Sequence, residues 1–241
     1  LNKAILREAN LSQTRMALAC LREADLTEAN LFWADLTGTD FTRACFKGII
    51  LSRADLTGAV LAYVDLSQLN LGWALLRKAD LNHAQLWQTD LNHARLSEAN
   101  LSHANLADAN LADADLAGAI LNGADLARST FSRADLSHAQ IIEANLVGID
   151  LTQAKLIGTD LTGADLTQAT LDKTSLLGAN LTNANLTKAN LISVNLDIKN
   201  PNGKDDLIHL PPQELAESIL IKEKQIAELM DEIKSLLTKG K

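Results

Sequence analysis

The sequence predicts an all-β solenoid, because a five-residue pattern repeats without interruption over about four-fifths of the chain. From Leu1 to Leu196, a large apolar residue occurs at every fifth position, 40 positions in all. Leucine fills 35 of them, and the other five are Met16, Phe41, Phe46, Phe131 and Ile141. The residue two places before each is usually alanine, replaced in some repeats by Thr, Ser, Ile, Val or Leu. Internal repeats of this kind stack on one another to bury a continuous core.

The period of five excludes both a helix and a flat strand. An α-helix turns about 100° per residue, so positions five apart would spiral around it instead of forming one face. A flat strand alternates with period two and would place successive leucines on opposite faces. A bend in every repeat allows each alanine and the leucine two residues later to point inward together. Nine of the ten glycines within residues 1–200 fall two places after the leucine position, where a turn would need them.

Repeats such as Ala24-Asp25-Leu26-Thr27-Glu28 resemble those of the pentapeptide-repeat family, whose motif is Ala-(Asp/Asn)-Leu-x-x. The resemblance covers about four-fifths of the chain and implies a right-handed quadrilateral β-helix with about 20 residues in each coil. Residues 1–200 would then form about ten coils, and at ~4.8 Å per coil the rod would be roughly 47 Å long. The family is abundant in cyanobacteria and most of its members have no assigned activity, so the chain looks like a cyanobacterial-type member.

The charge of the chain argues against direct binding of nucleic acid. Residues 1–200 carry 16 basic and 22 acidic side chains, a net charge of −6, whereas a nucleic-acid-binding protein would show a basic patch. No run of 18 apolar residues exists, which predicts no membrane span. A cytoplasmic location is expected, although an upstream leader could be missing because the chain starts at Leu1. Cys20 and Cys45 would lie on neighbouring sides of the solenoid, which disfavours a disulfide between them.

Outward residues 20 apart should stack in columns under the four-sided geometry. One column contains Trp33, Arg53, Trp73 and His93, and we regard it as the candidate partner-binding column. Exposed aromatic residues are plausible anchors for a partner, and alternating Trp and Arg suits cation–π stacking. The alternative is that these side chains stack only on one another and stabilise the rod.

Two further sets of columns were considered for chemistry. His83 and His103 would lie one coil apart beside Tyr63, which is too few ligands for a metal site. The aspartates before the leucines could in principle do acid–base work, but they recur all around a convex surface without a pocket. We expect them to hydrogen-bond the backbone near each bend instead. The sequence therefore predicts no enzyme, no catalytic residue, no metal and no cofactor. The two aspartate columns are Asp25, Asp65, Asp125 and Asp165, and Asp35, Asp55, Asp115 and Asp135.

The repeat ends after Leu196 and is followed by a segment of different composition. Residues 201–212 are predicted to be a linker or cap, and residues 213–239 an amphipathic α-helix that follows Pro211-Pro212. Isoleucine at the a positions and leucine at the d positions of its heptads favour a parallel two-stranded coiled coil, and hence a homodimer. The alternatives are a helix that caps the open end of the solenoid or one that binds a partner protein. The heptad residues are Leu215, Ile219, Ile226, Leu229, Ile233 and Leu236.

Two functions were weighed. The favoured hypothesis is a non-enzymatic rigid scaffold that presents side chains to an unknown protein partner. The alternative comes from the family resemblance, since one branch mimics DNA, binds DNA gyrase and protects it from quinolones. Duplex DNA carries about one charge per 1.7 Å, so a rod of this length would need on the order of 28 negative charges. Residues 1–200 have a net charge of only −6, and Arg15, Arg95 and Lys155 interrupt one aspartate column.

Overall fold

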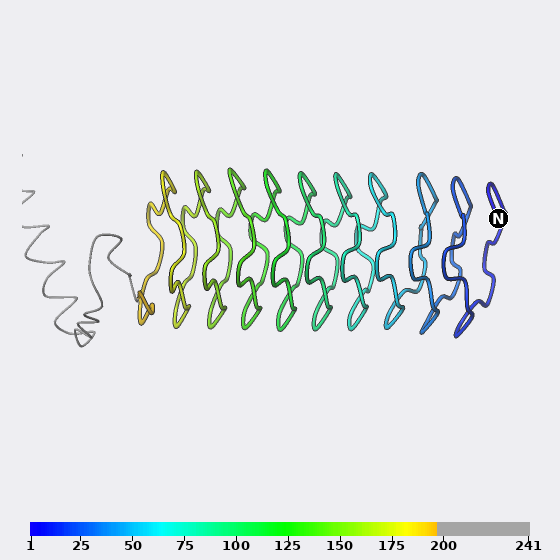
Figure 1. The fold of residues 1–241 in the computed structure, drawn as a ribbon, viewed down its shortest axis with the longest axis horizontal. Coiled ribbons are helices and arrows are strands. Elements are labelled where there is room, and N and C mark those ends of the chain that lie inside the picture. Colours follow the sequence, from blue (N-terminus) through cyan, green and yellow to red (C-terminus); the bar gives the residue numbers. More distant parts are fainter. Residues whose placement is uncertain (197–241) are drawn as a thin grey trace, which may run out of the picture. The chain divides into compact units, whose positions relative to one another are not determined.

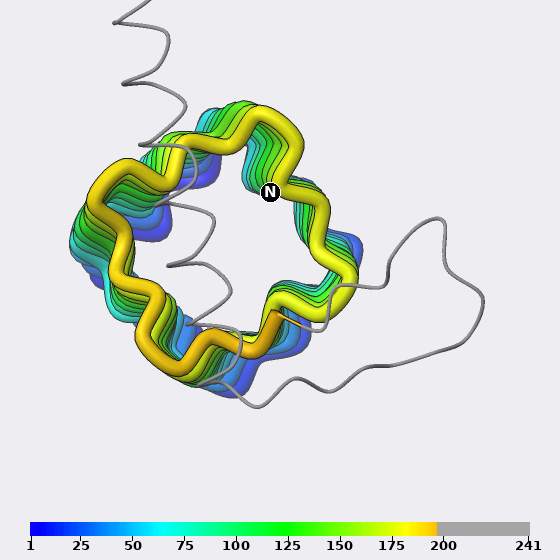
Figure 2. The backbone as a smooth tube through the Cα atoms, turned by 90° about the vertical axis from the view of Figure 1, so that its left-hand side faces the viewer, coloured from blue at the N-terminus to red at the C-terminus, as the bar shows by residue number. Residues whose placement is uncertain are grey.

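The computed structural model describes residues 1–196, which form a single solenoid of nearly ten coils (Figure 1). Parallel bridges join residues 20 apart from one end to the other, from Ile5 with Asp25 to Ser175 with Asn195. Seen from the C-terminal end of the solenoid, the chain winds counterclockwise towards the viewer around a four-cornered outline (Figure 2), which makes the helix right-handed. The predicted four-sided, right-handed β-helix is therefore confirmed. The predicted linker and helix over residues 201–239, with all the heptad residues, lie outside the described residues.

Every repeat combines one paired residue with one tight turn. Residues 1–196 contain no α-helix, hence none that could cross a membrane, and each side of a coil contributes a single bridge residue instead of a longer strand. Except at Ile141, the carbonyl of each leucine position up to Leu191 accepts a hydrogen bond from the N–H three residues on, as Leu21 does from Ala24 at 3.1 Å. The second turn residue has a φ of 54° to 68° in all 39 turns from Lys3 to Ser193. These angles are typical of a type II turn, which confirms the predicted bend in each repeat.

The inward-facing leucine and alanine positions fill the axis of the solenoid, as predicted. Leu111 and Ala109 are representative, because each is essentially inaccessible to water. Where threonine replaces alanine after the first coil, its hydroxyl donates a hydrogen bond to a carbonyl 23 residues earlier, for example from Thr89 to Leu66 at 2.8 Å. A buried hydroxyl that is hydrogen-bonded in this way does not carry the cost of an unsatisfied polar group. The alanine slot therefore accepts threonine without disturbing the core.

Where the residue before the leucine is aspartate or asparagine, it stabilises the turn that follows. Its side-chain oxygen accepts a hydrogen bond from the N–H two residues on, as Asp115 does from Ala117 at 3.1 Å. A hydroxyl in the turn can add a second hydrogen bond, such as that from Thr167 to Asp165, and this bond lowers the pKa of the Asp165 carboxyl. These are the hydrogen bonds of an Asx turn. They confirm the structural role predicted for the aspartate columns.

Candidate partner-binding surface

The four residues of the candidate column lie one coil apart on a single corner of the solenoid, as predicted. Trp33, Arg53, Trp73 and His93 each occupy the second turn position, with φ between 55° and 63°. The two tryptophans are more than half exposed. The repeat therefore sets both the spacing and the outward direction of these side chains.

From Arg53 onwards, the side chains of the column contact one another from coil to coil and form a ladder. The rings of Trp73 and His93 stack with their centroids 4.2 Å apart and an interplanar angle of 21°. The Arg53 guanidinium lies 5.8 Å from the Trp73 ring on the side of the preceding coil, close enough for a cation–π interaction. Trp73 thus has a stacking neighbour in the coil before it and in the coil after it, and it remains 52% exposed. The expected cation–π contact is present at this tryptophan.

The ladder continues into an ion pair. His93 lies 3.9 Å from Asp113, and Asp113 accepts two hydrogen bonds from Arg133, at 2.7 and 2.5 Å. The hydrogen bonds from the Arg133 guanidinium hold the pKa of the Asp113 carboxyl below its usual value. Charged groups that belong to neighbouring coils therefore bind each other, which joins the coils along this corner.

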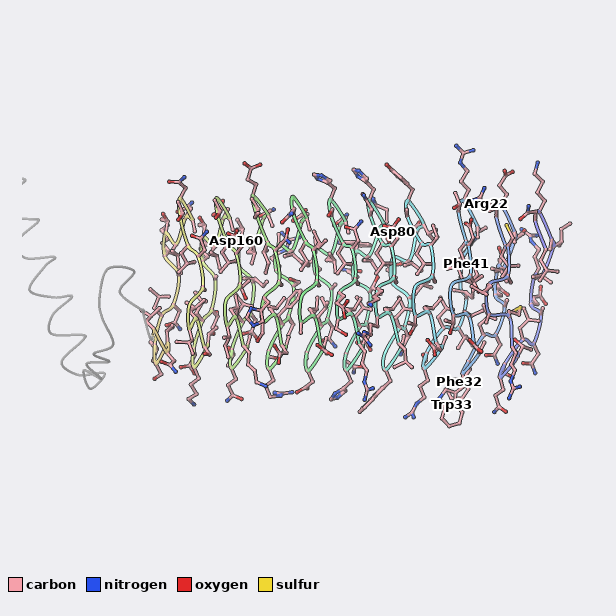
Figure 3. All side chains as sticks on the ribbon, viewed as in Figure 1. Arg22, Phe32, Trp33, Phe41, Asp80 and Asp160 are labelled. Atoms are coloured by element: carbon pink, nitrogen blue, oxygen red, sulfur yellow. The ribbon has the colours of Figure 1, made fainter. Side chains whose placement is uncertain are left out.

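Trp33 is arranged differently from Trp73. Its ring contacts Phe32 in the same turn, with the centroids 6.0 Å apart, and within residues 1–196 it does not stack on Gln13 or Arg53. Trp33 is 59% exposed and Phe32 is 36% exposed, and both project from the edge of the rod (Figure 3). We call Phe32 and Trp33 the aromatic pair. Phe32 was not among the predicted site residues, although its place beside Trp33 in one turn was visible in the sequence.

The diagonally opposite corner carries a second closed ladder. Tyr63 and His83 stack at 4.8 Å, and His83 and His103 stack at 5.0 Å. The next position in the column is Gly123, and the His103 ring lies so close to it that a Cβ there would be 2.6 Å from Nδ1. Within the described solenoid, no group of three or more His, Cys, Asp or Glu side chains is placed to hold a metal ion. The rings of Tyr63, His83 and His103 therefore mainly contact one another.

A shallow hollow of about 470 Å³ lies on a third corner and its adjoining side. Its central carboxylate, Glu98, binds Arg77 at 2.7 Å and Lys78 at 3.3 Å, and these cations lower the pKa of the Glu98 carboxyl. A general acid at neutral pH needs a raised pKa, so this arrangement favours a fixed ion pair over acid catalysis. The lining residues are Thr57, Leu75, Arg77, Arg95, Ser97, Glu98 and Asp115.

Cys20 and Cys45 are both exposed free thiols.

The architecture defines a class of protein: a β-solenoid of five-residue repeats whose axis is filled by leucine and alanine side chains. The family described as pentapeptide repeats matches residues 1–31, 40–77, 70–108, 109–146, 134–172 and 159–197. These segments cover most of the chain, which therefore belongs to the pentapeptide repeat family.

Several solved structures are similar to this chain. HetL, a pentapeptide repeat protein involved in heterocyst differentiation regulation from the cyanobacterium Nostoc sp. strain PCC 7120, is 34% identical; the match covers 82% of this chain and 93% of HetL, with a TM-score of 0.44. Rfr23, a pentapeptide repeat protein from the cyanobacterium Cyanothece 51142, is 30% identical over 39% of this chain and 64% of its own, with a TM-score of 0.38. QnrB1, a plasmid-mediated fluoroquinolone resistance protein, is 21% identical over 75% of this chain and 88% of its own, with a TM-score of 0.36. Among curated proteins, none matches the sequence significantly.

Proposed function

We propose that this chain is a non-enzymatic rigid scaffold for protein–protein interaction and that its candidate column contacts the partner mainly through the aromatic pair. The observation that carries the proposal is the difference between the two tryptophans of the column. Trp73 is stacked between Arg53 and His93, whereas Trp33 shares an exposed turn with Phe32 and has open ring surface. Exposed aromatic side chains on a rigid support are the residues that most often dominate binding energy at protein interfaces.

The solid core supports a role at the outer surface. Leucine, phenylalanine and alanine side chains fill the axis of the solenoid, so a small molecule has no internal space to enter. Arg53, which follows the aromatic pair in the column, makes no ion pair within residues 1–196. An apolar contact flanked by a guanidinium that has no carboxylate partner in residues 1–196 fits a partner surface that combines an apolar pocket with a carboxylate.

The neighbouring coil provides the variant that tests this proposal. The turn directly before the aromatic pair in the same column reads Ser12-Gln13, so Phe32→Ser with Trp33→Gln copies a turn that the chain already forms. We expect the double variant to fold normally and to lose most partner recovery in affinity capture from the source cell. The matched control is Tyr63→Gln, which removes an exposed ring from the opposite corner and should leave recovery unchanged. Equal recovery by the double variant and the wild type would rule out the aromatic pair as the contact.

The DNA-mimic alternative is disfavoured by the way the acidic side chains are paired. Five aspartates bind an arginine or lysine from a neighbouring coil, which neutralises part of the negative surface: Asp25 with Arg7, Asp40 with Arg22, Asp108 with Arg128, Asp113 with Arg133 and Asp135 with Lys155. We therefore expect no inhibition of supercoiling when purified DNA gyrase is assayed with micromolar protein. Inhibition, or protection of gyrase from a quinolone, would favour the mimic over the scaffold.

We also propose that the scaffold is a homodimer joined through residues 213–239, and this part rests on the heptad pattern of the sequence alone. Light scattering of the full chain and of a chain without residues 211–241 tests it. A halved mass after deletion is the expected result. An unchanged mass would leave capping or partner binding as the role of that segment.

A further inference from the structure

Two adjacent corners of the solenoid lack the backbone-to-backbone hydrogen bonds that join neighbouring coils everywhere else in residues 1–196. In the regular pattern each leucine N–H donates to the carbonyl 19 residues on, as Leu66 does to Gln85 at 2.8 Å. Two further patterns of backbone hydrogen bonds join neighbouring coils, one donated by the N–H of the second turn residue and one by the N–H of the bridge residue. Among amides whose partner also lies within residues 1–196, all three patterns are complete except for six consecutive bonds. The interruption lies between residues 43–51 and residues 62–70, and we call it the seam. The amides affected are those of Arg43, Phe46, Gly48, Leu51, Asp65 and Asn70.

Other observations agree that the two coils separate at the seam. The regular bridge pattern would pair Cys45 with Asp65 and Ile50 with Asn70, and neither of these bridges forms. All four of these residues are exposed, unlike most residues at this position of the repeat. In Figure 1 the gap between adjacent coils is widest between the third coil from the N-terminus, drawn in blue, and the next, drawn in cyan. Water can reach the unpaired backbone groups there, which lowers the cost of leaving them unpaired.

The size of the inward side chains accounts for the seam. Phe46 occupies a slot that holds leucine in the coils before and after, and its ring packs edge-on against Phe41 with the centroids 5.0 Å apart. Ile49 and Leu69 occupy the same inward slot in successive coils, and Ala29 fills that slot one coil earlier. Coils about 4.8 Å apart have room for small side chains stacked in this slot, and excess volume in a close-packed core forces the backbone to shift.

Single large residues elsewhere do not open the solenoid. Phe131 stands alone in its coil and its N–H reaches Asp150 at 2.7 Å, while the carbonyl of Ile149 accepts from Thr170 at 2.8 Å. The seam therefore results from the combination of large residues on these two neighbouring sides of the solenoid. Beyond it the bonds resume, first from Arg53 to Gly72 at 3.2 Å and then from Leu56 to Leu75 at 2.7 Å.

We propose that the seam is a hinge. The two coils open and close at these two corners while the other two corners stay hydrogen-bonded, so the rod bends between residues 1–42 and residues 71–196. Segments with few backbone hydrogen bonds open at lower free energy than the elements around them. The candidate column crosses between the same two coils, directly beyond the seam. Bending consequently changes the angle between the aromatic pair and the Trp73–His93 ladder. The hinge itself does not depend on whether the aromatic pair binds a partner.

Amide hydrogen exchange of the full chain, measured by NMR, tests the opening. The amides of Phe46, Gly48 and Leu51 are compared with their counterparts one coil earlier, Leu26, Glu28 and Leu31, which are bonded at 2.8 to 3.0 Å. We expect protection factors at least about tenfold lower at the seam. The closing variant Phe46→Leu, Ile49→Ala, Leu69→Ala restores the side-chain sizes of the regular repeat and should raise protection there to that of the counterparts. The control Phe131→Leu should leave the seam unchanged.

Spin-label distances distinguish a hinge from a fixed gap. Labels at residues 8 and 88 span the seam on the corner that contains Gly48. Labels at residues 88 and 168 lie on the same corner and span the same number of coils in regular solenoid. Both pairs use a chain in which Cys20 and Cys45 are replaced by serine. Each pair should be separated by about 19 Å along the axis. We expect a broader distance distribution for the first pair and a narrower one in the closing variant.

Three outcomes would overturn the hinge. The first is equal protection at the seam and one coil earlier in the wild type, and the second is equal width of the two distance distributions. The third is a closing variant that folds but stays unprotected, because the large side chains would then not be the cause. If the triple variant does not fold, Phe46→Leu alone should raise protection at residue 46, and no rise would count against the proposal.

Discussion

The coils of residues 101–140 and the coils on either side of the seam are built from the same repeat but fit together differently. In the first region, leucines and small residues stack in register, and the N–H of Leu106 reaches Asp125 at 2.7 Å. At the seam the corresponding bond of Phe46 is absent, yet the turns on both sides persist: Ala44 still donates to Phe41 at 2.8 Å and Ile49 to Phe46 at 3.1 Å. The turn is therefore a local property of each repeat, while the stacking of coils depends on the volumes of residues 20 apart.

The comparison predicts that the regular region is the more sensitive to loss of core volume. Leu111→Ala removes a fully buried side chain from coils that are already in contact, so the structure cannot collapse further, and we expect a loss of about 2–5 kcal/mol of unfolding free energy. Phe46→Leu at the seam removes excess volume and should cost less than about 1 kcal/mol or increase stability. Urea denaturation followed by circular dichroism measures both. A larger loss for Phe46→Leu than for Leu111→Ala would show that the seam is well packed.

The seam should also be transferable. Residues 106, 109 and 129 lie 60 positions after residues 46, 49 and 69, on the same corner, so Leu106→Phe, Ala109→Ile, Ser129→Leu copies the large residues into regular coils. We expect about 1–3 kcal/mol of destabilisation from overpacking and faster exchange of the amides at positions 106, 108 and 111. If those amides stay protected, the cause of the original seam is not side-chain volume alone.

A smaller effect is expected at the turns, which are alike in both regions. Gly58 and Gly123 have nearly the same φ, +65° and +64°, but a Cβ at Gly58 would meet nothing within 4 Å, whereas one at Gly123 would meet the His103 ring. Replacing either by alanine should cost about 1 kcal/mol because of the left-handed backbone. Gly123→Ala should cost more than Gly58→Ala, and the excess should vanish in a His103→Ser background. Equal unfolding free energies of the two variants would mean that the His103 ring moves aside freely.

The repeating pattern was sufficient to predict the bends, the inward slots and the outward columns, since each follows from the five-residue spacing alone. The number of sides and the hand of the helix depended on the family resemblance. The nine glycines indicated where the left-handed position falls, but 30 other residues adopt it too, including Trp33 and His103. They do so because the turn and inter-coil hydrogen bonds hold the backbone in that conformation in every repeat.

The seam and the difference between the two tryptophans could not be predicted in this way. Phe46, Ile49 and Leu69 each belong to the set of residues that the pattern allows, and only their stacking across two coils makes them too large together. Trp33 and Trp73 likewise have equivalent positions in the repeat. They differ because Arg53 lies over Trp73, which leaves Trp33 to contact Phe32. Both features depend on which side chains meet one another, and the five-residue spacing does not determine those contacts.

The smallest expected effect is electrostatic and belongs to the regular region. Arg128 and Arg133 bind Asp108 and Asp113 through paired hydrogen bonds, which lower the pKa of both carboxyls. A carboxyl whose pKa is lower in the folded chain stabilises it above about pH 4, and this contribution is lost as the pH falls through the folded-state pKa. The urea midpoint should therefore fall between pH 5 and pH 3, and slightly less in an Arg128→Gln, Arg133→Gln variant. The pairs are exposed, so the difference should be small and should shrink further in high salt. A midpoint that rises on acidification would show that repulsion among the remaining unpaired carboxylates outweighs these pairs.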